Sequence, residues 1–338
     1  MIQRAATRRL IALEDMRKTE KTEKEDAEIR KLLKFIESYK KYSEVSKLNS
    51  TFTGFPTGPD GRVHPKYKIH GTVTGRLSSV EPNIQNPPEE VLEIFKPVAG
   101  RVIVKADYSN IEYRVMAIIT GETELEKKFN AGQNFHDINT RLLFGIEKED
   151  AKWDVCRRAA KTFIFGLSYG GTVNGIYNKL LVAVPEMPMT LAQFTRLVDK
   201  YFQQLPKYKR WREETVKAAL RTRCVETPTG RKRFLLGMPG DIEREALNTP
   251  IQGTAGEIAE RALIKLDEWA IKYSKSTKLI CTVHDSILAE CDEADKMKVA
   301  RAMKKIMEEP FALCGRDVVF PVDVEIGDSW GTTAKVAL

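Results

Sequence analysis

Residues 101–121 read RVIVKADYSNIEYRVMAIITG, and this stretch decides the fold. Its first part, Arg101–Asp107, is dominated by β-branched and other apolar side chains, which is typical of a buried strand. From Ile111 the apolar residues follow helical spacing, and Gly121 suits the end of that helix. The sequence therefore predicts a strand that ends in a carboxylate and passes into a helix. Asp107 is the first candidate for chemistry, because a rigid strand would hold it at the open edge of a sheet.

A second carboxylate follows another strand. Lys278–Val283 reads KLICTV, His284 and Asp285 come next, and Ser286–Glu290 resumes an extended pattern. Two short strands around this pair predict a hairpin with Asp285 at its tip. If the hairpin lies beside the first strand, the two aspartates meet.

Two adjacent aspartates resist joint ionisation unless a cation neutralises them. A pair of Mg²⁺ ions about 4 Å apart would neutralise both and support in-line phosphoryl transfer. The alternative is that each aspartate merely ends its strand. Spacing along the sequence does not decide between these two interpretations.

A predicted helix carries a third candidate group. Arg157, Lys161, Phe165 and Tyr169 recur at steps of four, so they share one broad helix face. Its two cations suit a triphosphate, and its two aromatic rings suit stacking on a sugar and a base. The alternative is an arginine and a lysine whose stems cover a buried aromatic pair.

The remaining elements are predicted from periodicity and turn signals. Residues 1–48 predict one or two charged helices, and residues 51–62 and 81–88 predict loops. Asp154 is expected to cap the helix that ends near Gly170, and Pro206 is expected to interrupt a helical stretch. The other predicted elements are a hairpin at Cys224–Leu236, helices at Asp241–Asn248, Gly253–Tyr273 and Asp295–Glu308, and a strand at Pro321–Ile326.

Composition narrows the class of protein. The 338 residues include 42% hydrophobic and 30% charged side chains, which is ordinary for a globular protein. The net charge of +8 favours a polyanionic partner. The five cysteines form no CxxC pair, which argues against a zinc site or a disulfide framework and favours a reducing cytoplasm. No apolar run of about 18 residues and no signal-peptide pattern occurs, so we expect a cytoplasmic protein without membrane contact.

The motifs together resemble the palm and fingers of family A DNA polymerases, the bacterial polymerase I type. Five segments carry the resemblance, in the order of the family and across roughly residues 65–330. They are Thr74–Ser79 with Pro82–Asn86 (primer-template segment), Asp107–Arg114 (motif A), Arg157–Gly170 (motif B), Asn248–Ala255 (minor-groove segment) and Val283–Asp285 (motif C).

The resemblance implies a role for each matching residue. Two Mg²⁺ ions, which Mn²⁺ replaces in some conditions, would be bound by Asp107, Asp285 and the Tyr108 carbonyl. Lys161 would join the two aspartates as a catalytic residue. Arg157 and Lys161 would hold the triphosphate of the nucleotide, and Phe165 would lie against its sugar. Glu112 would be the steric gate against a 2′-hydroxyl. Tyr169 would lie at the templating base, and His284 would lie near the primer terminus. The primer-template contacts would be Arg76, Asn83, Gln85, Arg244, Asn248 and Gln252, in the minor groove, where acceptors occur on every base pair.

Three positions depart from the family pattern. Ser286 follows the motif C aspartate where the family usually has glutamate, and the related single-subunit RNA polymerases also have serine there. We therefore expect weakened metal geometry rather than lost activity. Asn110 replaces the usual glutamine. Phe165, where some relatives have tyrosine, implies discrimination against dideoxynucleotides.

We expect an α+β right-hand polymerase fold with an antiparallel palm sheet, helical fingers and a short or absent thumb. The expected units are a thumb-like stub (1–48), palm (49–118 and 241–338) and fingers (119–240). The expected function is template-directed DNA synthesis from dNTPs on primer-template DNA, without a proofreading exonuclease in this chain. Low processivity is expected unless a processivity factor or a separate thumb or exonuclease chain supplies grip.

The chain is expected to be a minimal phage-like enzyme, one piece of a split polymerase or a domain of a longer chain. Two alternative functions stay open. One is an RNA-synthesising or priming enzyme on the same fold, which Ser286 favours. The other is a subunit that binds primer-template without catalysis, which the short thumb favours.

Overall fold

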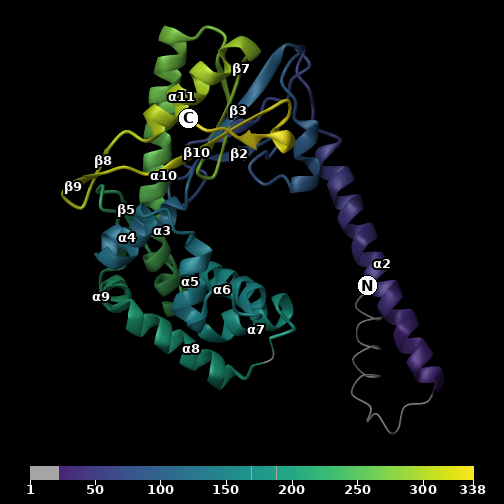
Figure 1. The fold of residues 1–338 in the computed structure, drawn as a ribbon, viewed down its shortest axis with the longest axis vertical. Helices are drawn as coiled ribbons and strands as arrows, with labels where there is room; N and C mark the ends of the chain where they lie inside the picture. Colours follow the sequence, from purple (N-terminus) through teal and green to yellow (C-terminus); the bar gives the residue numbers. More distant parts are fainter. Residues whose placement is uncertain (1–22, 169, 188) are drawn as a thin grey trace.

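The structure is a computed structural model of the chain that describes residues 23–168, 170–187 and 189–338. Residues 1–22 of the predicted helical stub lie outside these ranges, as does Tyr169. From Glu23 the stub is a single helix, α2 (Glu23–Phe52), which stands apart from the other helices as an arm (Figure 1). Within the described ranges, no helix has both the length and the apolar character that a membrane crossing requires.

A five-stranded antiparallel sheet forms the centre of the molecule, with the order β11-β10-β3-β7-β6. Four strands confirm the sequence-based expectation to within two residues, and the short strand β11 was not predicted. The bounds are β3 Arg101–Tyr108, β6 Lys278–Val283, β7 Ser286–Asp292, β10 Val322–Gly327 and β11 Ala334–Lys335. Because β3 is the middle strand, its last residues have a neighbour on each side.

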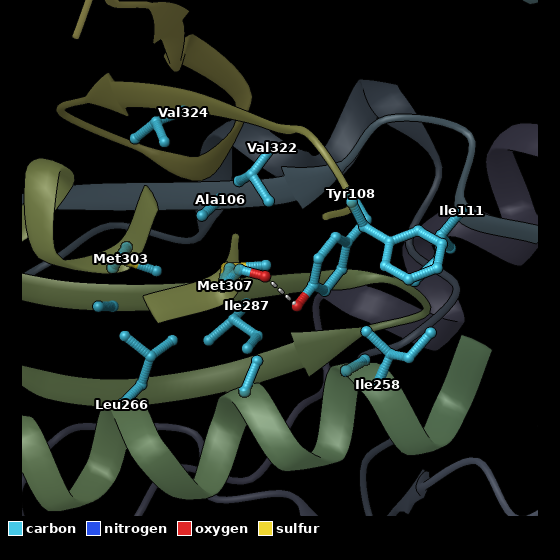
Figure 2. Packing of buried hydrophobic residues seen from close by; sticks show 14 of the residues in the cluster. Ala106, Tyr108, Ile111, Ile258, Leu266, Ile287, Met303, Met307, Val322 and Val324 are labelled. Atoms are coloured by element: carbon cyan, nitrogen blue, oxygen red, sulfur yellow. Dashed lines mark hydrogen bonds between the residues drawn. The ribbon is translucent and has the colours of Figure 1, made fainter. Parts of the chain in front are cut away.

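Alternation along β3 separates the core from the second face of the sheet. Val102, Val104, Ala106 and Tyr108 are buried in one cluster against helices α10 (Pro239–Tyr273) and α11 (Lys296–Met307). Figure 2 shows Ala106 and Tyr108 in this cluster. The Tyr108 hydroxyl donates a 2.8 Å hydrogen bond to the Met307 carbonyl in that core. The odd-numbered residues therefore lie on the opposite face.

Helix α10 (Pro239–Tyr273) runs along the sheet and on toward the other helices (Figure 1). The prediction of two helices here was wrong, because α10 continues through Pro250. Proline removes one backbone donor, but much of the helix is buried, and this packing maintains it. Helix α11 (Lys296–Met307) confirms the predicted helix to within one residue at each end.

A second layer of helices surrounds its own hydrophobic core, which includes Phe163, Phe194 and Tyr201. The prediction that Asp154 caps a helix was wrong, because α6 begins at Trp153 and Asp154 lies in its first turn. The break at Pro206, which separates α8 from α9, is confirmed. The layer comprises α3 Ile111–Thr120, α4 Thr123–Asn130, α5 Phe135–Phe144, α6 Trp153–Ser168, α7 Val173–Ala183, α8 Leu191–Gln204 and α9 Pro206–Thr222.

Short elements complete the described chain. The predicted hairpin is present as β4 (Cys224–Glu226) and β5 (Lys232–Phe234). The other short elements are β1 Lys66–Lys68, β2 Ser78–Val80, β8 Phe311–Leu313, β9 Arg316–Val318, and the 3₁₀ helices η2 Glu89–Ile94, η3 Glu293–Asp295 and η4 Trp330–Thr332.

Candidate functional site

Asp107 and Asp285 are brought together at one end of the sheet. Strand β3 pairs with β7 so that Asp107 faces Ser286. Val283 pairs with Ser286, which leaves His284 and Asp285 as the turn of the hairpin. The Tyr108 amide donates a 3.2 Å hydrogen bond to the Asp285 carbonyl, so strand end and hairpin tip are joined. The conditional expectation that the two aspartates meet is thereby fulfilled.

Both aspartates line one cavity of about 810 Å³, which we call the site cavity. A second cavity of about 750 Å³ lies around Arg114 and Arg316, and both arginines are already bonded to protein groups. The site cavity is the larger of the two and holds the paired carboxylates. The predicted residues that line it are Arg76, Gln85, Asp107, Tyr108, Glu112, Phe165, His284 and Asp285.

Electrostatics at Asp107 favour a bound cation. Burial raises the pKa of Asp107 to about 6, the Lys105 ammonium opposes this shift, and the neighbouring Asp285, Glu325 and Asp323 carboxylates add to it. A carboxyl that resists ionisation beside other carboxylates gains from a nearby positive ion.

Arg76 connects two of the predicted site residues. Its Nη2 donates to Glu112 Oε1 at 2.7 Å and to Asp285 Oδ1 at 2.8 Å. Its Nε is buried without a hydrogen-bond partner among the described residues. Burial raises the pKa of Glu112, while Arg76 acts in the opposite direction. The predicted steric gate and the predicted metal ligand therefore share one guanidinium.

The donor set suits a hard divalent cation. Mg²⁺ takes oxygen ligands and is usually held by one or two carboxylates together with waters and phosphate oxygens. Asp107, Asp285 and the Tyr108 carbonyl supply oxygen atoms at one sheet end. Within the described residues, no group of three or more His, Cys, Asp or Glu side chains is placed to hold a metal ion. The arrangement fits an open site rather than an all-protein cage.

His284 occupies the hairpin tip with a φ of 53°, in the left-handed region that favours glycine. Burial and then the nearby Arg76 lower the pKa of its imidazole. A bulky residue held in this conformation is consistent with a needed side chain at the tip.

The predicted nucleotide helix is α6, and of the three predicted residues on it that the structure describes, Arg157, Lys161 and Phe165, only Phe165 lines the site cavity. The Phe165 ring is 43% exposed, and the Lys161 ammonium lies 5.9 Å from its centroid. Arg157 lies two turns earlier and donates from Nε to Asp137 Oδ1 at 2.8 Å. Lys161 and Arg157 thus lie on the helix beside the cavity rather than on its wall.

The predicted primer-template residues fall into two groups. Within their loop, Asn83 Oδ1 accepts from the Gln85 backbone amide at 2.9 Å. Gln85 Nε2 connects this loop to β6 by donating to the Thr282 carbonyl at 3.1 Å. On α10, Arg244 pairs with Asp241 at 3.0 Å, and Asn248 donates to Gln252 at 3.3 Å. Gln252 is buried, and its side chain acts to lower the pKa of Glu112.

The cavity residues that the sequence-based reasoning missed include His136 and Lys105. His136, from α5, lies with its ring 6.4 Å from that of Phe165. Burial, followed by the charges of Arg157 and Lys161, lowers its pKa. No local pattern marks this residue, because the packing of α5 on α6 brings it there. Lys105 was also missed, although its position two residues before Asp107 places it on the same face of β3.

Comparison with known proteins defines the class. The sequence model of DNA polymerase family A matches residues 5–332, and the chain belongs to this family. It is 32% identical over 283 residues to the thermostable DNA polymerase I of Thermus aquaticus, covering 80% of this chain and 32% of that protein. It is 34% identical over 285 residues to DNA polymerase I of Streptococcus pneumoniae serotype 4 (80% and 31%), and 32% identical over 307 residues to the DNA polymerase of Bacillus phage SP01 (83% and 33%).

The solved structures agree with this assignment. The POL domain of Pol1 from M. smegmatis, in complex with DNA primer-template and dNTP, matches with a TM-score of 0.74 at 26% identity, covering 91% of this chain and 53% of that one. The mixed helical and antiparallel architecture is thus the right-hand polymerase fold. The chain spans about a third of the length of the three curated relatives named above.

Proposed function

We propose that this chain is a template-directed DNA polymerase core that adds dNTPs to a primer 3′-hydroxyl. The observation that carries the proposal is the meeting of Asp107 and Asp285 in the site cavity, beside the exposed ring of Phe165. Family membership supports the same activity. In this polymerase core, the central sheet together with residues 49–118 and 241–338 would form the palm. Residues 119–240 would form the fingers.

Each described residue then has a task that its position supports. Asp107, Asp285 and the Tyr108 carbonyl would hold two Mg²⁺ or Mn²⁺ ions. When bound, such ions supply a Lewis acid at the attacking hydroxyl and neutralise charge on the leaving pyrophosphate. Phe165 would position the nucleotide sugar, and Glu112, held by Arg76, would crowd a 2′-hydroxyl. Catalysis would rest mainly on positioning and electrostatic stabilisation.

Lys161 and Arg157 would bind the triphosphate from α6. Arg157 would have to exchange Asp137 for phosphate oxygens, and Lys148, which also pairs with Asp137 at 2.8 Å, would keep that carboxylate partnered. The primer-template would run past Arg76, Asn83, Gln85, Arg244, Asn248 and Gln252, and Tyr169 would meet the templating base.

Primer extension by the purified chain tests this proposal. The reaction contains a primed template, Mg²⁺, and either dNTPs or rNTPs, with Asp285→Ala as the control. We expect template-dependent extension with dNTPs and none in the control. Binding of the primed template without any extension would contradict a self-sufficient polymerase core and favour a binding subunit of a split enzyme.

Ser286 supports a second candidate, an RNA-synthesising or priming enzyme on the same fold. Its buried hydroxyl donates to the Val283 carbonyl at 2.9 Å, so it stabilises the hairpin and offers no carboxylate to a metal. If this candidate is correct, Glu112→Ala will change the ratio of dNTP to rNTP incorporation little. A large loss of discrimination would exclude it.

A further inference from the structure

Lys105 is a cation on the wall of the site cavity with no role in the scheme above. It lies in the middle of β3, the central strand, and its side chain is only 23% exposed. The neighbouring residues on the core face, Val104 and Ala106, are fully buried. Lysine is an expensive choice at such a place, because an ammonium that leaves water needs a partner.

The ion pair that Lys105 forms with Glu325 can be exchanged for another. Lys105 Nζ lies 3.1 Å from Glu325 Oε2, on the adjacent strand β10. The same Glu325 oxygen also accepts a 2.9 Å hydrogen bond from the Thr333 hydroxyl. If the ammonium moves to another anion, Glu325 therefore keeps a hydrogen bond and partial contact with solvent. Glu325 is thus not left without a partner when Lys105 binds another anion.

The order of groups along the sheet shows which anion would meet Lys105. On its face of β3, Ile103 packs against Trp330, Leu92 and Phe95 at one end of the cavity. Lys105 and then Asp107 follow along the strand, and Phe165 and His136, which come from the helical layer, also line the cavity. A nucleotide seated on Phe165 leaves the opposite side, past Asp107 toward Lys105, for the primer strand.

The spacing agrees with this path. Residues two apart on a strand stand about 7 Å apart on one face. A primer whose 3′-hydroxyl lies at Asp107 carries its nearest backbone phosphate one sugar away, which is a step of similar length. Lys105 provides a compact, flexible point charge where that phosphate would lie.

We propose that the Lys105 ammonium binds the last backbone phosphate of the primer strand, exchanging Glu325 for it. This inference rests on the proposed function, because it places the primer terminus at Asp107. Lys105 would hold the primer end in position for attack, and contact with phosphate would make this role independent of base sequence.

Chemical removal of the phosphate charge tests the contact. Fluorescence anisotropy measures binding of a primed template to the wild-type chain and to Lys105→Met, with a native primer or one with a neutral methylphosphonate at its last linkage. We expect Lys105→Met to weaken binding of the native primer about tenfold and to have no effect on the neutral one. The slope of log affinity against log salt should fall by about 1. An equal loss on both primers would overturn the contact.

Glu325→Gln is the matched variant that separates binding from structure. It breaks the ion pair and leaves the ammonium free, so we expect primer binding as tight as in the wild type or tighter. A loss equal to that of Lys105→Met would show that the pair only supports the fold, and would overturn the inference. Lys105→Arg should retain most of the affinity, and urea unfolding of each variant shows whether the fold is intact.

The two proposals fail in different ways. A wild-type chain that binds the primed template but does not extend it contradicts the polymerase activity, while the comparison of native and neutral primers still decides the role of Lys105. A wild-type chain that binds no primed template overturns both.

Discussion

Asp107 shows how one residue can be unfavourable for the fold and useful in the site. It is the last residue but one of the central strand and is surrounded by Asp285, Asp323 and Glu325. Folding removes water from its carboxyl group and brings these carboxylates near it. Both effects penalise the ionised form, which is the form that binds a cation. A metal ion would therefore stabilise the folded chain as well as support its activity.

Asp107→Asn should stabilise the metal-free protein at neutral pH. The folded pKa of Asp107 is about 6, above the ordinary value of 3.8. The contribution of the protonated Asp107 carboxyl to the free energy of unfolding is therefore fully present below about pH 4. It is lost as the pH rises through 6. Asparagine avoids that loss, so the free energy of unfolding at pH 8 should rise by roughly 1–3 kcal/mol. Urea unfolding in EDTA across this pH range measures the difference.

The matched control for this prediction is Asp267→Asn, an exposed aspartate on α10. The difference in free energy of unfolding between this variant and wild type should not grow between pH 4 and pH 6. A gain at Asp107 that is the same at pH 4 and pH 8 would contradict the linkage, because it would not follow ionisation of the carboxyl group.

At the scale of elements, the contact between α6 and α7 decides where the helix with Phe165 lies. Gly166 faces Ile176 of α7, and a Cβ at Gly166 would lie 2.6 Å from Ile176 Cγ1. That is closer than carbon atoms approach without something moving. The glycine therefore permits close helix packing, at the cost of a weaker helix.

Gly166→Ala should consequently destabilise the protein. Overpacking costs about 1–3 kcal/mol, and the better helix propensity of alanine returns at most about 1 kcal/mol. Gly240→Ala in α10, where the new Cβ meets nothing within 4 Å, is the matched control and should be neutral or slightly stabilising. Urea unfolding compares the two. Equal stability of both variants would mean that α7 moves away at little cost.

At the scale of the whole molecule, local sequence patterns predicted the helices and strands better than they predicted which of these elements contact each other. The strands around Asp107 and Asp285 were predicted because alternation and turn signals lie within a few residues of each other. The continuity of α10 through Pro250 was missed, because tertiary burial outweighs the local effect of proline. His136 was missed as a site residue for a similar reason, since the packing of α5 on α6 determines that it lies beside Phe165. Lys105 could have been found, because its spacing of two from Asp107 places both residues on one face of the strand. The roles of the predicted site residues remain predictions.

The link between the α2 arm and the sheet gives the last prediction. Glu290 of β7 is buried at 1% exposure and accepts two hydrogen bonds from Arg62, at 3.0 and 2.7 Å, and one from Arg101 at 3.1 Å. Arg62 belongs to the loop that follows the arm. A chain of aromatic contacts, Phe52–Phe55–Phe95–Trp330, forms a second link and ends at the site cavity.

Glu290→Gln should weaken this joint strongly, because it leaves two guanidinium groups beside a neutral amide. Breaking a fully buried ion pair from one side costs about 3–5 kcal/mol. The cost here should be smaller, because both guanidinium groups keep partial contact with water and Arg101 also pairs with Asp292. Burial alone would raise the pKa of Glu290, but Arg62 and Arg101 outweigh it and lower the pKa. The stabilisation is thus present above the ordinary carboxyl pKa and is lost as the pH falls through the lowered value. Urea unfolding should show a difference from wild type that is largest at neutral pH and shrinks in acid.

Glu309→Gln is the control for this joint, because Glu309 pairs with Lys265 at the surface, where an ion pair contributes at most about 1 kcal/mol. Limited proteolysis adds a local readout: Glu290→Gln should speed cleavage within residues 53–65, while Glu309→Gln should not. If both variants unfold and are cleaved alike, Glu290 does not hold the arm. The aromatic contacts would then be the link that fixes α2 beside the site cavity, and Phe95 would be the residue to change next.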